Sequence, residues 1–160
     1  MTLLVEVCAA VILDQSGLLL ATRAPGKDLS GQWELPGGKL HSQETPAECI
    51  SRELHEELRL TVEQASLFLS MVHHYPHKSI RLHFLHCRLS RQDPMPQEGQ
   101  KTARFNSTEL PWQHMAEADR LALEFLRSAK WRINTGQGTE LPEIVDLPLA
   151  ERIHHWLKLS

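Results

Sequence analysis

An excess of positive charge is missing from this sequence. Its 160 residues include 17 lysines and arginines against 20 aspartates and glutamates, so the formal net charge is −3. Proteins that bind duplex nucleic acid do so mainly through basic side chains that contact the phosphates. The sequence shows no broad basic field of that kind, and we expect no duplex nucleic acid among its partners.

Long apolar runs and export signals are missing as well. No stretch reaches the roughly 20 apolar residues that a membrane-spanning helix needs. The first residues contain no basic segment followed by an apolar run and a cleavage site. With 41% hydrophobic and 23% charged residues, the composition is that of an ordinary soluble domain. We expect a cytoplasmic protein that contacts no membrane and is a monomer or a weak homodimer.

Cysteine is scarce, with Cys8, Cys49 and Cys87 far apart in the sequence. The number is odd, and no spacing is typical of a metal site. Cys8 and Cys87 fall in runs that are expected to form strands. We interpret all three as buried free thiols in a reducing compartment.

Hydrophobic periodicity predicts a mixture of strands and helices. Strands are expected at 5–13, 18–23, 61–75, 80–84 and 102–105, and helices at 46–58, near 117–129 and from 148 onward. The turn at 14–17 predicts an N-terminal hairpin, and residues 134–139 are expected to be flexible. This order is typical of an α/β (α+β) fold in which a mixed β-sheet packs between helices. We assign residues 1–132 to this domain and residues 133–160 to a C-terminal extension whose short helix packs on it.

The first helix has the strongest start signal. Thr45 and Glu48 have the spacing of a capping box, and Pro46 stands in the first turn, where its missing N–H costs nothing. One side of this helix is an apolar stripe, and the other carries several glutamates. Carboxylates at i, i+3 and i+4 converge and repel one another, and a hard divalent cation such as Mg²⁺ prefers oxygen ligands. Taken alone, however, this side is better explained as a solvated acidic surface.

A longer pattern surrounds this helix. It runs Gly38, five residues, Glu44, seven residues, Arg52-Glu53-Leu54, one residue, Glu56-Glu57. Its six polar or glycine positions, at average residue usage, recur by accident about once in 10⁵ chains of this length. The pattern resembles the box of the Nudix hydrolases, with one departure: the family has glycine where this chain has Arg59. Glycine there ends the helix in a left-handed conformation, which would strain Arg59 by about 1–2 kcal/mol.

The resemblance implies the Nudix fold, with the box as a loop-helix-loop beside the sheet. Within the family, the chain is most similar to the MutT-like nucleoside triphosphate pyrophosphohydrolases. Segments that match that group are Thr22-Arg23, Glu34–Lys39, Tyr75-Pro76, Glu98–Gln100 and Ala118-Asp119. The implied reaction is Mg²⁺-dependent attack of water at the β-phosphorus, with Mn²⁺ as a substitute ion. Its products are nucleoside monophosphate and pyrophosphate, and its substrates include oxidised nucleotides such as 8-oxo-dGTP.

The resemblance also implies the metal ligands, which are the carboxylates of Glu53, Glu56 and Glu57 and the carbonyl of Gly37. A pair of glycines suits a carbonyl that is aimed at a cation, because glycine adopts backbone conformations that other residues avoid. The general base is either Glu53 or Glu98, a carboxylate on a later loop. Glu98 is equally explained as an exposed loop charge.

Further residues are implied in positioning and substrate binding. Arg52 would orient Glu53 or Glu56, and Glu44 would support that network. The substrate-binding residues are Arg23 and Lys39 for the phosphates, Leu35 beneath the base and Asp119 at the purine edge. Arg23 and Lys39 are also explained as surface cations, and Asp119 as an acidic residue that favours a helix N-terminus.

Two other functions stay open from the sequence. One is hydrolysis of another nucleoside diphosphate derivative, such as ADP-ribose or a dinucleoside polyphosphate. Tyr75-Pro76 occurs in subgroups with those substrates and in MutT-like members, so it does not decide between them. The other is a non-catalytic nucleotide- or DNA-binding module, which is disfavoured because such a module lacks the box that is complete here.

Overall fold

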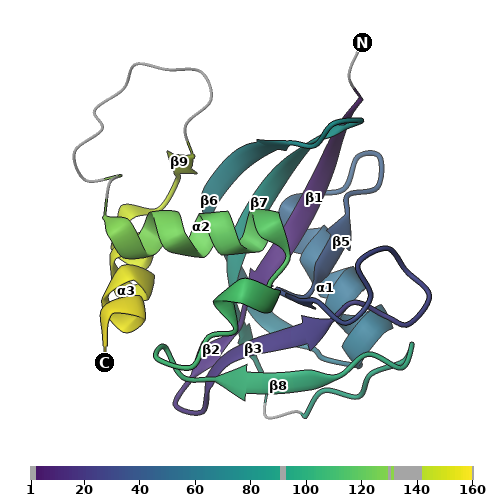
Figure 1. Ribbon diagram of the computed structural model, residues 1–160, viewed down its shortest axis with the longest axis horizontal. Coiled ribbons are helices and arrows are strands. Elements are labelled where there is room, and N and C mark those ends of the chain that lie inside the picture. The colour runs from purple at the N-terminus through teal and green to yellow at the C-terminus, as the bar shows by residue number, and fades with distance from the viewer. Residues whose placement is uncertain (1–2, 91–92, 130, 132–141, 160) are drawn as a thin grey trace.

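The computed structural model describes residues 3–90, 93–129, 131 and 142–159 (Figure 1). Its strands are β1 (Leu4–Val11), β2 (Leu13–Asp14), β3 (Gly17–Thr22), β4 (Trp33–Glu34), β5 (Gly37–Lys39), β6 (Val62–His74), β7 (Ser79–Leu89), β8 (Thr102–Phe105) and β9 (Glu143–Ile144). Its helices are α1 (Pro46–Leu58), the short 3₁₀ helix η1 (Trp112–His114), α2 (Glu117–Ser128) and α3 (Leu147–Lys158). No helix among these described residues has the length and apolarity needed to cross a membrane.

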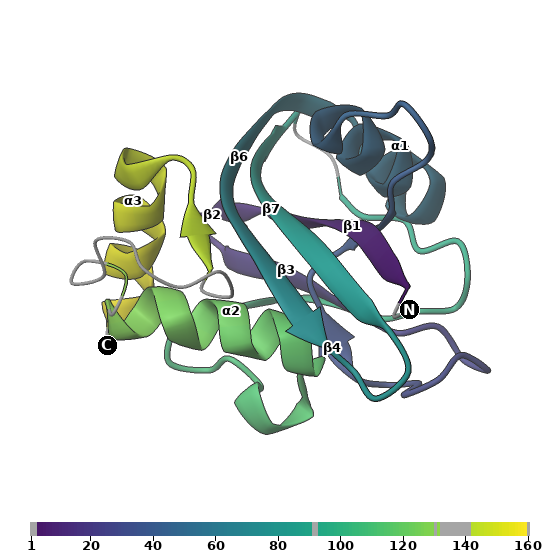
Figure 2. The same ribbon diagram turned by 90° about the horizontal axis from the view of Figure 1, so that it is seen from above.

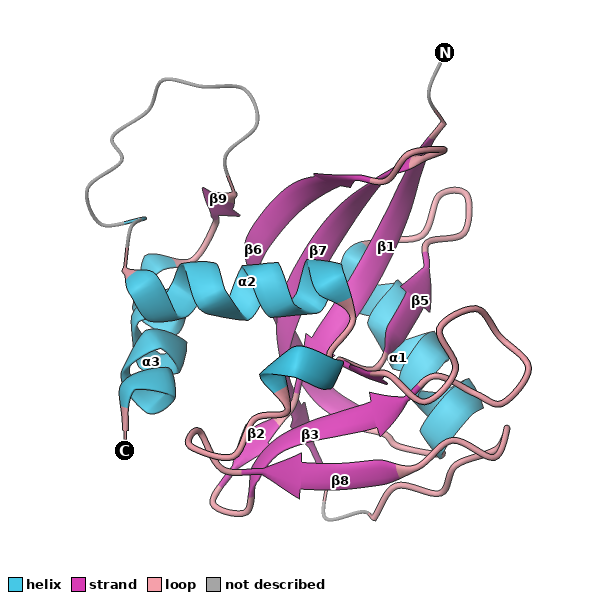
Figure 3. Cartoon of the chain, viewed as in Figure 1, coloured by secondary structure: helices cyan, strands magenta, loops and turns pink. Residues whose placement is uncertain are grey.

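The described strands form two sheets. The larger one has the order β5-β1-β7-β6-β9, in which β1 and β7 run parallel and the other neighbours run antiparallel. The smaller one has the order β2-β3-β4, with β8 paired on β3. Helix α1 lies on one face of the larger sheet, and β3, α2 and α3 cover the other face (Figures 2 and 3). The predicted mixed sheet between helices is therefore confirmed, and a second small sheet is added to it.

The N-terminal hairpin that we predicted is wrong in part. Only Leu13 and Asp14 pair with the returning strand β3, whereas all of β1 pairs in parallel with β7. The physical reason is the burial of β1: residues 8–12 are buried in succession, as expected for a strand that is covered on both faces. The chain thus passes from the larger sheet to the smaller one near Ile12.

Helix α1 begins as the sequence predicts. The Thr45 hydroxyl accepts from the Glu48 backbone N–H, and the Glu48 carboxylate accepts from the Thr45 N–H, which completes the capping box. The apolar side of the helix is buried against the sheet through Cys49, Ile50, Leu54 and Leu58. Its opposite side therefore carries the glutamates away from that apolar contact.

The C-terminal extension contributes to the same core. Asp146 caps α3 by accepting from the Leu149 N–H, and Leu149, Ile153 and Leu157 pack in one cluster with residues of α2 and β6. The boundary at residues 132 and 133 stays a prediction, and the segment 134–139 lies outside the described residues.

The three cysteines do not all behave as the sequence predicted. Cys8 and Cys49 form a disulfide with their Cα atoms 6.6 Å apart, and only Cys87 is a free, buried thiol. The partners are 41 residues apart in sequence, and they meet because α1 packs on β1. This tertiary contact carries no local sequence signal.

The C-terminus of α1 bears the strain that the sequence predicts. Arg59 has φ 56°, in the left-handed region, and its N–H donates to the His55 carbonyl. We expect Arg59→Gly to raise the free energy of unfolding by about 0.5–1 kcal/mol, because the relief of about 1–2 kcal/mol of strain exceeds the extra entropy of glycine in the unfolded chain. Arg59→Ala is the matched control, since it keeps the Cβ atom. Urea denaturation in which the glycine variant is no more stable than the alanine variant would contradict this assignment of strain.

Candidate active site

A cleft of about 1130 Å³ opens between the Gly37-Gly38 pair of β5, the first residues of α2 and the loops around residues 27 and 98. Of the residues predicted for the site, it is lined by Arg23, Leu35, Gly37, Lys39, Glu53, Glu57, Glu98 and Asp119. Glu44, Arg52 and Glu56 do not line it. The fold thus gathers residues from five separated segments into one cavity.

Gly37 and Gly38 are required here for close packing. Both have ordinary negative φ angles, which differs from our expectation of a special backbone conformation. A Cβ at Gly37 would lie 2.0 Å from the Cys8 carbonyl oxygen, and a Cβ at Gly38 would lie 2.3 Å from the Glu53 carboxylate. The missing side chains let β5 pair with β1 on one side and let Glu53 lie against Gly38 on the other.

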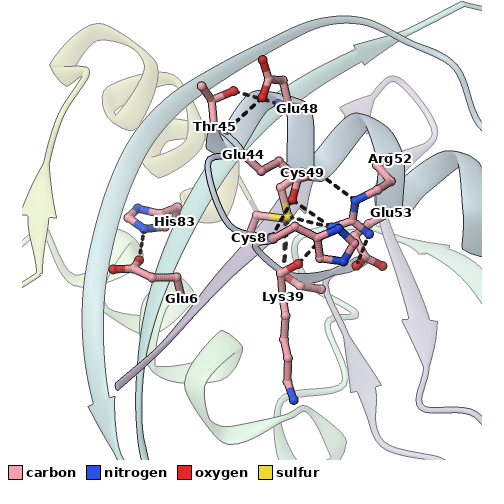
Figure 4. Close-up of a disulfide and its surroundings, with 12 residues drawn as sticks. Glu6, Cys8, Lys39, Glu44, Thr45, Glu48, Cys49, Arg52, Glu53 and His83 are labelled. Atoms are coloured by element: carbon pink, nitrogen blue, oxygen red, sulfur yellow. Dashed lines mark hydrogen bonds and ion pairs between the residues drawn. A yellow bond between two sulfur atoms is a disulfide. The ribbon is translucent and has the colours of Figure 1, made fainter. Parts of the chain in front are cut away.

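Arg52 holds a network of carboxylates behind the cleft (Figure 4). Its Nε and Nη2 donate to the two carboxylate oxygens of Glu44, at 2.7 and 3.0 Å, and its Nη1 donates to Glu53 at 2.9 Å. Nη2 also donates to the Lys39 carbonyl at 2.9 Å, which ties α1 to β5. The hydrogen bonds from Arg52 lower the pKa of Glu44 to about 2. This geometry brings Arg52, Glu44 and Glu53 together; their roles in catalysis stay predictions.

The three glutamates of α1 differ in their surroundings. Glu53 is 13% exposed and held by Arg52, whereas Glu56 is 59% exposed, with an oxygen 3.4 Å from Arg52 Nη1. Burial, with the nearby charge of Glu53 next in importance, raises the pKa of Glu57 to about 7. A partly buried carboxylate beside other carboxylates favours a cation. Within the described part of the chain, however, no three acidic, histidine or cysteine side chains are already grouped as ion ligands.

The loop of Glu98 is tied to the end of α1. The N–H groups of Met95 and Gln97 donate to the carbonyls of Leu58 and Glu57, at 2.8 and 3.0 Å, and so satisfy the end of the helix. This anchoring brings the Glu98 side chain to the cleft, where it pairs with Lys27 at 3.1 Å. Lys27 also lines the cleft, and our reading of the sequence missed it because it lies in a loop without a motif.

Arg23 is also fixed at the cleft. Its Nε donates to the Asp28 carbonyl at 2.6 Å, and its Nη1 pairs with Glu34 at 3.3 Å. Burial raises the pKa of Glu34, and the charge of Arg23 opposes that shift. Glu34 is a second cleft residue absent from our predicted set, although it stands beside Leu35 in a segment that matched the family pattern.

Asp119 points into the fold and does not cap its helix. The N-cap residue of α2 is Ala116, without a side-chain hydrogen bond, whereas the Asp119 Oδ2 accepts from the Leu35 backbone N–H at 2.9 Å. Burial, reinforced by the charge of Glu34, raises the pKa of Asp119 to about 7. Asp119 does lie in the first turn of α2, as the helix-start interpretation expects, and its side chain contacts Leu35 in addition. Asp119 is also one of the residues that line the cleft.

The buried carboxyl group of Asp119 makes stability depend on pH. Its pKa in the folded protein, about 7, lies above the ordinary value of 3.8. The folded state therefore favours the protonated form, so the contribution of Asp119 to stability is fully present below about pH 4 and is lost as pH rises to about 7. We expect a loss on the order of 2–4 kcal/mol over that range, which corresponds to a fall in Tm of about 5–10 °C.

The matched control is Asp119→Asn, which keeps the acceptor for the Leu35 N–H and removes the ionisable group. Thermal unfolding of both proteins between pH 4 and 8 measures the difference. The wild type should lose several degrees more than the variant as pH rises. Parallel curves for the two proteins would contradict the assignment of the raised pKa to Asp119.

The sequence is similar to proteins of a known family. The family model described as the NUDIX domain matches residues 3–132. An 8-oxo-dGTP diphosphatase of Proteus vulgaris is 38% identical over 80 residues, which are 49% of this chain and 71% of that protein. An 8-oxo-dGTP diphosphatase of Escherichia coli K12 is 30% identical over 96 residues, 59% of this chain and 74% of that protein.

Solved structures agree with the sequence matches. The crystal structure of a MutT NUDIX hydrolase from Burkholderia pseudomallei has a TM-score of 0.65 and 28% identity, covering 76% of this chain and 96% of its own. The solution structure of the Escherichia coli ORF135 protein has a TM-score of 0.65 and 27% identity, covering 81% of this chain and 94% of its own. With the box, the cleft and these likenesses in agreement, the chain belongs to the Nudix family of hydrolases.

Proposed function

We propose that the protein hydrolyses nucleoside triphosphates to nucleoside monophosphate and pyrophosphate, with oxidised nucleotides such as 8-oxo-dGTP as substrates. The observation that supports this most is the layout of the cleft. Glu53, Glu57 and Gly37 line it, and so does the buried Asp119. A cavity of about 1130 Å³ holds a whole nucleotide, since ligand sites usually measure about 300–1,000 Å³.

The residues present fit a divalent cation. The carboxylate of Glu57 has a pKa raised to about 7 by burial and by Glu53, and a cation at that place would relieve both effects. Oxygen donors of this kind suit Mg²⁺, with Mn²⁺ as a substitute. The proposed ligands are Glu53, Glu56, Glu57 and the Gly37 carbonyl, and Glu56 would have to turn from its exposed position. When bound, Mg²⁺ neutralises phosphate charge and lowers the pKa of a bound water.

The side chains of the chain itself supply position and charge. Arg52, held by Glu44, fixes the Glu53 carboxylate through its hydrogen bond of 2.9 Å. Arg23 and Lys39 line the cleft as cations for phosphate oxygens. The proton acceptor for the attacking water is Glu53 or Glu98. Glu98 is half exposed and pairs with Lys27, so it has to leave that partner to act.

The base lies, in this proposal, in the part of the cleft that is lined by Leu35 and Asp119. The Leu35 N–H occupies one oxygen of Asp119 and leaves Oδ1 for the base. A carboxyl with a pKa of about 7 is part protonated near neutrality, so Oδ1 can accept or donate a hydrogen bond. Leu35 is an aliphatic contact and provides no aromatic ring for stacking. We further propose a cytoplasmic location and a monomeric or weakly dimeric state.

A substrate panel tests the proposal. The purified protein with Mg²⁺ would be given 8-oxo-dGTP, dGTP, CTP, ADP-ribose and a dinucleoside polyphosphate, and the products would be separated by ion-exchange chromatography. The expected result is pyrophosphate and monophosphate from the triphosphates, with the highest kcat/KM for 8-oxo-dGTP. Cleavage of ADP-ribose alone, or of none of these compounds, would contradict the proposal.

A preference for CTP is the alternative result of this substrate panel that one of the relatives supports. A CTP pyrophosphohydrolase of Escherichia coli K12 is 34% identical over 83 residues, 52% of this chain and 62% of that protein. Tighter use of CTP than of 8-oxo-dGTP would keep the reaction and replace the substrate.

A further inference from the structure

The disulfide joins β1 to α1 (Figure 4). Cys8 lies on β1, where it is paired with Gly38 of β5, and Cys49 lies in α1. Both sulfur atoms face the Gly38 carbonyl oxygen, at 3.4 Å for Cys8 and 3.7 Å for Cys49. Both side chains are buried, with 1% and 0% exposure. The disulfide therefore contacts Gly38 of β5.

Gly38 lies beside both the sulfur atoms and the carboxylate of Glu53, on the side of β5 that faces α1. The Glu53 carboxylate packs so closely against Gly38 that a Cβ there would lie 2.3 Å from it. The neighbouring Gly37 provides the carbonyl proposed as a metal ligand. Since protein interiors are close-packed and transmit small displacements, a shift of the sulfur atoms reaches Glu53 and the two glycines.

We propose that Cys8 and Cys49 are a reversible oxidation site that sets the alignment of α1 with the Gly37-Gly38 pair. The sulfur atoms of a disulfide are about 2 Å apart, whereas two thiols in non-bonded contact are about 3.5–4 Å apart. Because the two sulfur atoms are buried, α1, β1 or β5 has to move to accommodate the larger distance between two thiols. The oxidised form holds Glu53 against Gly38, and the reduced form loosens that contact.

The oxidant in this proposal is hydrogen peroxide. The Cys49 thiolate attacks one oxygen of hydrogen peroxide and breaks the O–O bond, and the released hydroxide takes up the thiol proton to leave as water. The Cys8 thiolate then attacks the sulfenic acid, forms the S–S bond and releases a second water in the same way. Two electrons pass from sulfur to the peroxide. A dithiol reductant restores both thiols by exchange.

The surroundings distinguish this pair from the third cysteine. Arg52 Nη2, which also holds Glu44 and the Lys39 carbonyl, lies 3.8 Å from the Cys49 sulfur, so a change at this sulfur directly contacts the carboxylate network. Cys87 has no such neighbour among the described contacts, and burial raises its pKa to about 12. Reversibility rests on the cytoplasmic location proposed above, because disulfides in reducing compartments are usually transient.

The test compares the full-length protein after peroxide treatment with the same protein in dithiothreitol. We expect an intact mass lower by two hydrogens in the oxidised form and a Tm higher by about 10 °C. We expect Mn²⁺, titrated alone by electron paramagnetic resonance, to bind at least about 10-fold tighter to the oxidised form. Cys49→Ala should abolish all three differences, and the matched control Cys87→Ala should keep them.

Each contrary outcome has a distinct meaning. An unchanged mass after peroxide would overturn the oxidation site itself. If the mass and the Tm shift but the oxidised and reduced forms bind Mn²⁺ with equal affinity, the proposed coupling of the disulfide to Gly37 and Gly38 is overturned. Absence of Mn²⁺ binding in both forms would overturn the coupling and the metal-dependent function together. None of these measurements uses a nucleotide, so an error in the proposed substrate leaves them unaffected.

Discussion

Glu57→Gln is expected to lower kcat by about 10³-fold or more while the domain stays folded. A metal ion contributes several kcal/mol of transition-state stabilisation, and each 1.36 kcal/mol corresponds to about a tenfold change in rate. Glu57 lines the cleft, and its raised pKa, about 7, shows an environment that disfavours an uncompensated negative charge. A neutral amide of the same shape removes the ligand and leaves the packing in place.

The measurement is steady-state turnover with saturating Mg²⁺, accompanied by thermal unfolding without metal. The Tm of the variant should equal or exceed that of the wild type at pH 8, because the amide carries no charge to desolvate. Glu63→Gln is the matched control, since Glu63 is an exposed carboxylate paired with Arg88 and does not line the cleft. Turnover of Glu57→Gln within tenfold of the wild type would refute its role as a ligand.

Alanine substitutions of the two adjacent glycines are expected to have different effects: Gly38→Ala lowers activity, and Gly37→Ala lowers stability. At Gly38 the new Cβ meets the flexible end of Glu53 at 2.3 Å, so the carboxylate moves and the fold survives. We expect kcat to fall by about 10²-fold, the loss that a displacement of about 1 Å causes in a catalytic group. At Gly37 the new Cβ meets the Cys8 carbonyl at 2.0 Å, and the pairing of β5 with β1 has to break.

Urea denaturation and turnover separate the two variants. Gly38→Ala should keep a midpoint near that of the wild type and lose activity, whereas Gly37→Ala should lose several kcal/mol of stability, as overpacking against a rigid neighbour does. Each variant serves as the control for the other, because both add one methyl group to the same glycine pair. A Gly38→Ala variant that loses several kcal/mol of stability but keeps its kcat would show that the close contact between Glu53 and Gly38 does not position the carboxylate for catalysis.

The helix and its box were predictable because their signals are local. Thr45, Pro46 and Glu48 determine where α1 starts, and the apolar stripe determines which side packs on the sheet. The pattern also singled out Arg59 as the position where a left-handed residue would be strained, and Arg59 is left-handed in the structure. Such features depend on neighbours in sequence, and no tertiary contact overrides them here.

Features that depend on distant contacts were not predictable in this way. The parallel pairing of β1 with β7 joins strands that lie on either side of α1 in sequence, and periodicity does not specify a partner. The Cys8–Cys49 pair and the hydrogen bond from Leu35 to Asp119 also connect distant positions. Their geometry appears only once the helices lie on the sheets, which is also when Lys27 and Glu34 reach the cleft.

The central claim is that the glutamates of α1 and the Gly37 carbonyl bind Mg²⁺, which in turn binds the phosphates of a nucleotide. A crystal structure with Mg²⁺ and a non-hydrolysable nucleoside triphosphate tests it most directly. The account predicts an ion with oxygens of Glu57, Glu53 and Gly37 at about 2.0–2.1 Å and with phosphate oxygens completing its coordination. A nucleotide bound elsewhere, or an ion that contacts none of these three residues, would contradict it.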